Sequence, residues 1–123
     1  MLLVDEIVER TDSEIHCRKS FRADEFFFQG HYPDSPIVPG VILCESAMQA
    51  GAILLSEHVG EAEGVPVATR MNNVQFRRIV RPGETVDLHV TLEDAAGGAF
   101  RLKAKVLCEG STCARLEFAC MMA

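Results

Sequence analysis

The stretch from Gly40 to about His58 limits the possible folds more than any other part of the chain. It contains no proline and one internal glycine, Gly51, which is typical of a helix of about five turns. Apolar or small residues cover nearly its whole circumference. Because such a helix must be covered on most sides, we expect the rest of the chain to wrap around it.

Much of the remaining chain alternates between apolar and polar residues, which is the pattern of half-buried strands. Three such segments follow one another near the C-terminus, and the short turns between them favour an antiparallel meander. Two more segments near the N-terminus predict a hairpin. The predicted strands cover residues 2–9, 15–21, 65–80 (as one or two strands), 86–92, 100–106 and 114–120.

One long helix and about five or six strands, with no repeating β-α-β order, argue against a parallel sheet. The simplest burial of the helix is a curved antiparallel sheet wrapped around it, an α+β fold. A chain of 123 residues has room for one such core. We therefore expect a single domain over residues 1–123.

Charge and cysteine content narrow the possible functions. A net charge of −6 argues against general nucleic-acid binding, which needs surplus Lys and Arg. The five cysteines lack metal-type spacing, and the N-terminus lacks the basic leader of a secretory signal. Residues 38–56 include Glu45 and Gln49, so we interpret them as a buried helix rather than a membrane span. These features predict a cytoplasmic protein with reduced cysteines and no bound metal.

Glu45 is a candidate for acid–base chemistry, because it lies about one and a half turns into the apolar helix. A buried carboxyl either finds partners or keeps its proton. Either environment suits a general acid. The alternative is that Glu45 simply faces a solvent cleft or an ion-pair partner.

His31 belongs to the segment FFFQGHYPDSPIVPG, residues 26–40, whose prolines and glycines predict a shaped loop leading into the helix. Such a loop can hold an imidazole in place for proton transfer, although a lone loop histidine can also be structural. The first amides of the helix, at Gly40, Val41 and Ile42, are predicted to point outward, where they can donate hydrogen bonds to a developing oxyanion.

The run FFFQGHYPDSPIVPGVILCESAMQAG, residues 26–51, resembles the signature of the β-hydroxyacyl-acyl carrier protein dehydratases, which have the hot-dog fold. Weaker similarity to this family extends over residues 2–5, residues 72–84 and the closing strands. The glutamate at position 45 resembles the dehydratase-only branch, since the isomerising branch typically has aspartate. The positions in family register are Gly30, His31, Pro33, Pro36, Pro39, Gly40, Val41, Glu45 and Gln49.

This resemblance implies a reaction and an assembly. It implies dehydration of (3R)-3-hydroxyacyl thioesters on acyl carrier protein to trans-2-enoyl thioesters in fatty-acid biosynthesis. His31 would remove the C2 proton, Glu45 would protonate the departing hydroxyl, and amides at the helix start would bind the thioester oxygen. The pair would come from two subunits of a homodimer, three dimers would form the larger assembly, and no cofactor would be needed.

Other residues support more specific hypotheses. Gln49 shares the helix face of Glu45 and is expected to orient its carboxyl group. Met48 is expected to narrow the acyl tunnel and favour shorter chains. The arginines at positions 70, 77, 78 and 81 occur in a stretch without acidic residues, and we expect them to dock an acidic carrier protein. The alternative for these arginines is a solvated strand face.

Two other functions remain open from the sequence. The first is a hot-dog thioesterase, which would use a carboxylate to activate water; the second is a binding module for acyl thioesters without turnover. The choice between acyl carrier protein and coenzyme A is also open. Family members usually have a short segment before residues 2–5, so we expect part of the tunnel wall or dimer edge to be missing here. In this chain Asp34-Ser35 replaces a glycine-containing pair, which affects the loop shape.

Overall fold

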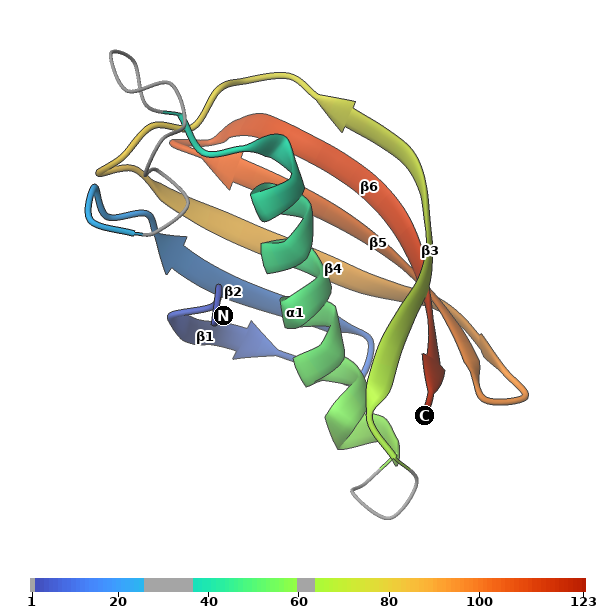
Figure 1. Ribbon diagram of the computed structural model, residues 1–123. Helices are drawn as coiled ribbons and strands as arrows, with labels where there is room; N and C mark the ends of the chain where they lie inside the picture. The colour runs from blue at the N-terminus through green and yellow to red at the C-terminus, as the bar shows by residue number, and fades with distance from the viewer. Residues whose placement is uncertain (1, 26–36, 60–63) are drawn as a thin grey trace.

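A computed structural model describes residues 2–25, 37–59 and 64–123 of the chain. Six antiparallel strands form one sheet in the order β1-β2-β4-β5-β6-β3, and α1 lies along its concave face (Figure 1). The elements are β1 Glu6–Arg10, β2 Glu14–Ser20, α1 Gly40–Val59, β3 Pro66–Phe76, β4 Thr85–Ala96, β5 Ala99–Cys108 and β6 Ser111–Met122.

The core lies between α1 and the inner face of the sheet. Residues of β5 alternate between this core and the outer face along the whole strand, and those of β4 and β6 do so over 85–90 and 114–120, as their sequence period predicts. Consecutive strands pair as an antiparallel meander, with Leu102 opposite Phe118. The prediction of a helix wrapped by a curved antiparallel sheet is confirmed.

Gly51 allows the helix to approach the sheet closely. A Cβ atom at this position would lie 2.7 Å from the ring of Phe118 and 3.3 Å from Leu102. Both side chains are buried on neighbouring strands. The glycine inside the helix therefore has a packing function, which offsets its low helix propensity.

The structure differs from the sequence prediction at two places. Residues 2–5 are not in a strand: Leu3 and Val4 are buried, and β1 begins at Glu6. The stretch 65–80, predicted as one or two strands, forms the single strand β3. The helix is also less enclosed than predicted, because one stripe of α1, defined here as the open stripe, is only half-buried or exposed; it comprises Val41, Ile42, Glu45, Met48, Gln49, Ala52, Ile53 and Ser56.

All five cysteines lie in the described residues, where they are buried and free of disulfides, as predicted. Among the described residues, no helix combines the length and apolarity needed to cross a bilayer.

Candidate active site

Glu45 lies on the open stripe of α1, where its side chain is half-buried. The Gln49 amide, one turn further along the helix, donates from Nε2 to Glu45 Oε1 over 3.3 Å. The spacing of four residues puts both side chains on one helix face, as predicted. The two residues therefore form a polar pair on a mostly apolar helix.

Gln49 also contacts the N-terminal segment. The backbone amide of Leu3 donates to Gln49 Oε1 over 2.7 Å. Leu3 itself is buried, and the Asp5 amide donates to the Arg18 carbonyl over 2.8 Å, so the segment is fixed on both sides of Val4. The sequence gives no direct signal for this contact, because it depends on a backbone group whose partner lies 46 residues away.

The start of α1 is fixed by two neighbours. The Val38 amide donates to the Val80 carbonyl over 2.7 Å, and the ring of Phe76 packs so closely that a Cβ at Gly40 would lie 2.7 Å from it. Glycine at the first helical position thus allows β3 and α1 to meet.

Of the three amides at the start of α1, that of Ile42 already has a hydrogen-bond partner within the chain. It donates to the Pro39 carbonyl over 2.9 Å. The amides of Gly40 and Val41 have no hydrogen bond to another described residue. These two amides, at the positive end of the helix dipole, are therefore the ones suited to bind an anionic oxygen.

His31 lies outside the described residues, together with the rest of the stretch 26–36. Described groups flank it on both sides. Glu25 contacts the ammonium group of Lys19, and Val38 bonds to Val80. The His31–Glu45 pair therefore stays a prediction from the sequence.

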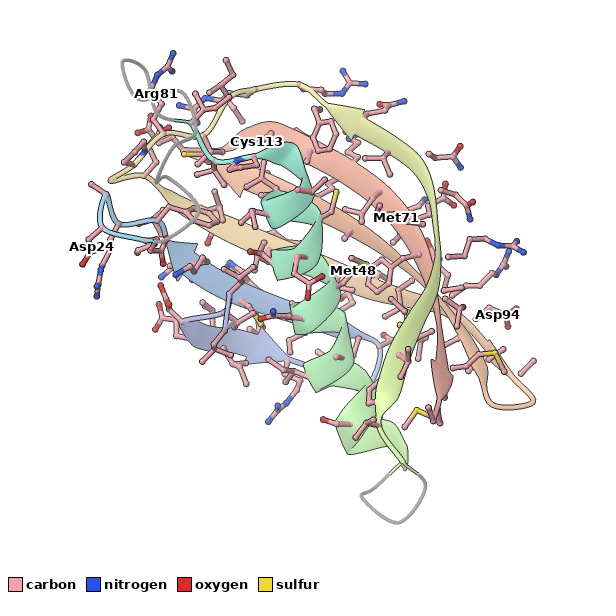
Figure 2. The ribbon with its side chains drawn as sticks, in the orientation of Figure 1. Asp24, Met48, Met71, Arg81, Asp94 and Cys113 are labelled. Atoms are coloured by element: carbon pink, nitrogen blue, oxygen red, sulfur yellow. The ribbon has the colours of Figure 1, made fainter. Side chains whose placement is uncertain are left out.

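Met48 and Met71 lie in the space between α1 and β3 (Figure 2). Met48 is half-buried and packs against the core, whereas Met71 is 44% exposed although its strand neighbour Phe118 is buried. The side of the helix that bears Glu45 is thus bordered by apolar side chains.

The structure separates the four arginines proposed for docking. Arg77, Arg78 and Arg81 lie in or next to the connection between β3 and β4, whereas Arg70 is further back on β3. Arg78 is partly buried: it donates to Glu84 over 2.9 Å and contacts the sulfur of Cys113. The hydrogen bond to Glu84 raises the pKa of the Arg78 guanidinium.

Glu84 is a hydrogen-bond partner of Arg78 and Arg81 that was not predicted from the sequence. Its carboxylate accepts the Arg81 amide over 2.8 Å as well as the Arg78 guanidinium, and these hydrogen bonds lower the pKa of Glu84. Its position in the sequence could have indicated this contact, since Glu84 directly follows the arginine-rich stretch. Arg77 and Arg81 remain exposed.

The part of the chain that the structure describes contains no group of three or more His, Cys, Asp or Glu side chains arranged to hold a metal ion. At the described site the structure provides one carboxyl group, one side-chain amide and two backbone amides.

Comparison with known proteins places the chain in a family. The model of the ApeI-like family, described as ApeI dehydratase, matches residues 7–115. The 3-hydroxyacyl-[acyl-carrier-protein] dehydratase FabZ of Oenococcus oeni is 42% identical over 106 residues, which are 83% of this chain and 76% of that protein. FabZ of Syntrophobacter fumaroxidans is 38% identical over 94% of this chain and 80% of that protein.

Solved structures show the same fold at low identity. The dehydratase heterocomplex ApeI:P of Xenorhabdus doucetiae matches 99% of this chain and 83% of that chain, with a TM-score of 0.83 and 15% identity. Thioesterase HI1161 of Haemophilus influenzae matches 96% of this chain and 77% of that chain, with a TM-score of 0.74 and 15% identity.

One antiparallel sheet wrapped around a helix that bears a carboxyl group defines a protein of the hot-dog class, as the resemblance predicted. Within that class, the chain belongs to the ApeI-like dehydratase family.

Proposed function

We propose that this chain dehydrates 3-hydroxyacyl thioesters, with Glu45 as the general acid. The observation that carries the proposal is the placement of Glu45 in a chain of a dehydratase family. Its half-buried carboxyl lies on the open stripe of α1, about one and a half turns beyond the Gly40 and Val41 amides. An acid and an oxyanion site are thus available on the same helix.

The elimination needs three groups. His31 removes the proton from C2, and the electron pair of that bond forms the new double bond. Glu45 protonates the hydroxyl group at C3 as the C–O bond breaks, which releases water. The amides of Gly40 and Val41 bind the thioester oxygen while it carries enolate-like charge. This scheme uses no metal or organic cofactor.

Acyl carrier protein is the proposed carrier of the substrate. The relatives from Oenococcus and Syntrophobacter are named as dehydratases of 3-hydroxyacyl-[acyl-carrier-protein]. By this analogy the chain converts (3R)-3-hydroxyacyl thioesters to trans-2-enoyl thioesters in fatty-acid biosynthesis, in the cytoplasm. Its acidic partner would meet the exposed guanidinium groups of Arg77 and Arg81.

Met48 is proposed to limit acyl chain length, because it lies between α1 and β3 beside the helix face that carries Glu45 (Figure 2). We expect Met48→Ala to raise kcat/KM for long-chain enoyl thioesters relative to a four-carbon one. The measurement is a chain-length series, and an unchanged ratio would remove the proposed role of Met48.

A second copy of the chain is the proposed partner of the β3 edge. In a single chain, this edge of the sheet and the helix start expose apolar side chains to water. Val41 is 69% and Phe76 55% exposed, and Val67, Met71 and Ile79 are also exposed. In the homodimer proposed here, His31 of one subunit would meet Glu45 of the other.

The test is reversible hydration of a short trans-2-enoyl thioester, followed by loss of the conjugated-enoyl absorbance. We expect turnover by the wild type and a loss of at least about 100-fold in His31→Ala and in Glu45→Gln, the scale of one acid–base group. Circular dichroism of each variant would show that the fold is kept. Absence of wild-type turnover on both acyl carrier protein and coenzyme A substrates would overturn the proposal.

Two rival functions have distinct outcomes in the same assay. A thioesterase would release free thiol, which a thiol reagent detects; the likeness to thioesterase HI1161 is one of fold. A binding module would bind acyl thioesters and convert none. Dehydration is favoured over both by the family of the chain.

A further inference from the structure

We propose that the backbone amide of Leu3, acting through Gln49, fixes the orientation of the Glu45 carboxyl group and thereby selects the oxygen that carries the transferable proton. Leu3 and Gln49 are positioning residues in this proposal, which rests on the proposed dehydration. Three groups are connected in series: Leu3 N to Gln49 Oε1 over 2.7 Å, and Gln49 Nε2 to Glu45 Oε1 over 3.3 Å.

The Leu3 amide decides which way the Gln49 side chain faces. A carboxamide has an acceptor end and a donor end, and either end can in principle face a given neighbour. A backbone N–H can only donate, so the Gln49 atom next to it must be the oxygen. The NH2 group is consequently directed at Glu45, where it can only donate.

The Leu3 amide is itself held in place. Leu3 is 1% exposed and Val4 6%, and the Asp5 carboxylate accepts the Ser20 amide over 2.7 Å. The Asp5 amide also donates to the Arg18 carbonyl. Residues 3–5 thus form a segment anchored to β2, which presents one N–H to the helix.

A donor at Oε1 has a consequence for catalysis. It occupies a lone pair of that oxygen, so the acidic proton of Glu45 is carried by Oε2. When Oε2 delivers this proton to the leaving hydroxyl, the carboxyl becomes a carboxylate, and a hydrogen bond to a charged acceptor is stronger than one to a neutral acceptor. The contact therefore strengthens during the reaction and favours the transition state over the bound substrate.

The experiment is a double-mutant cycle in the enoyl-hydration assay. Gln49→Met removes both ends of the amide at similar volume, and Leu3→Pro removes the N–H. We expect Gln49→Met to lower kcat about tenfold, the cost of one hydrogen bond to a charged group, with KM changed less than about twofold. In the Gln49→Met background, Leu3→Pro should lower kcat by less than about twofold further, because its effect passes through Gln49.

Leu2→Pro is the matched control, since it places the same ring one residue earlier, at a side chain that is 77% exposed. It should leave kcat near the wild-type value. Additive losses in the cycle, or equal losses in Leu2→Pro and Leu3→Pro, would overturn the proposal. Thermal unfolding of each variant separates loss of fold from loss of orientation.

A second measurement needs no turnover. The side-chain amide of Gln49 gives a pair of ¹H–¹⁵N signals, assigned by their absence in Gln49→Met. These signals should shift in Leu3→Pro and in Glu45→Ala and stay in place in Leu2→Pro; unshifted signals would overturn the proposal. An inactive wild type would remove the dehydration proposal, and the signals would still decide whether Leu3 fixes Gln49.

Discussion

At the scale of single residues, Lys19 is a charged group on the core-facing side of β2. It lies in line with Ile15, Cys17 and Phe21, all of which are buried. Its side chain is 6% exposed, and the ammonium group contacts Glu25 and lies 3.6 Å from the Asp5 carboxylate and 5.5 Å from the centroid of the Phe21 ring. This cation connects the N-terminal segment to the residue that precedes the stretch 26–36.

Removal of this cation should be costly, because the Glu25 carboxylate, whose side chain is only 18% exposed, would lose its partner. We expect Lys19→Met to lower the free energy of unfolding by about 3 kcal/mol, measured by urea denaturation. The double variant Lys19→Met/Glu25→Gln should recover most of this loss. Arg22→Met is the control, since the Arg22–Asp24 pair nearby is exposed and should contribute nothing measurable. An equal loss in the double variant would contradict the role of the ion pair.

Glu84 makes stability depend on pH in a defined direction. Its pKa is lowered in the folded chain from the ordinary 4.5, first by the Arg81 amide and then by Arg78. A carboxyl group with a lowered pKa stabilises the fold above its unfolded pKa, and this contribution is lost as the pH falls through the folded pKa.

Glu84→Gln should therefore be less stable than the wild type at pH 7, by about 1 kcal/mol for a partly exposed charged hydrogen bond. The difference should shrink as the pH is lowered below 4.5. Urea denaturation at a series of pH values measures it. A difference that is constant from pH 7 to pH 3 would show that the carboxylate charge does not matter.

At the scale of elements, the connection between β3 and β4 combines structure and proposed docking. Arg78 and Glu84 form an ion pair inside it, whereas Arg77 and Arg81 expose their guanidinium groups. Reversing the charge of Arg78 would leave Glu84 facing a carboxylate and would mix a stability effect with a docking effect. The two exposed arginines are the cleaner positions for a test.

We expect Arg77→Glu/Arg81→Glu to raise KM for the acyl carrier protein substrate at least about tenfold, since like charges at an interface weaken encounter and affinity. Activity on a small N-acetylcysteamine thioester should change less than about twofold. Higher salt should reduce the difference between wild type and variant. Equal losses on both substrates would contradict docking at these positions.

The elements whose burial follows a simple period were predictable from the sequence. The helix beginning at Gly40 and the strand alternation of Phe100, Leu102 and Ala104 are examples. The burial of Leu3 and Val4 was not predictable, because two successive buried residues break the alternation of a strand. Glu45 and Gln49 were predictable as polar residues on an apolar helix, whereas Leu3 acts through a backbone amide, which no side-chain pattern reveals.

At the scale of the whole molecule, the open stripe of α1 and the β3 edge leave the proposed active site uncovered in one chain. Glu45 is half-buried, and Phe76 and Val41 beside the helix start are exposed. A dimer related by a two-fold axis would bury these surfaces on both subunits by the same contact. It would also bring together the two catalytic residues of the proposal from different chains.

Mixing two inactive variants tests this arrangement. In a dimer of one His31→Ala chain and one Glu45→Gln chain, one site would contain both substitutions and the other neither. If each site takes His31 from one subunit and Glu45 from the other, random exchange of subunits should restore about a quarter of the wild-type activity, because half of the dimers are mixed and each has one intact site. Refolding the variants together from urea, compared with each refolded alone, provides the measurement. No activity in the mixture, with dimers present by analytical ultracentrifugation, would show that both residues act within one chain.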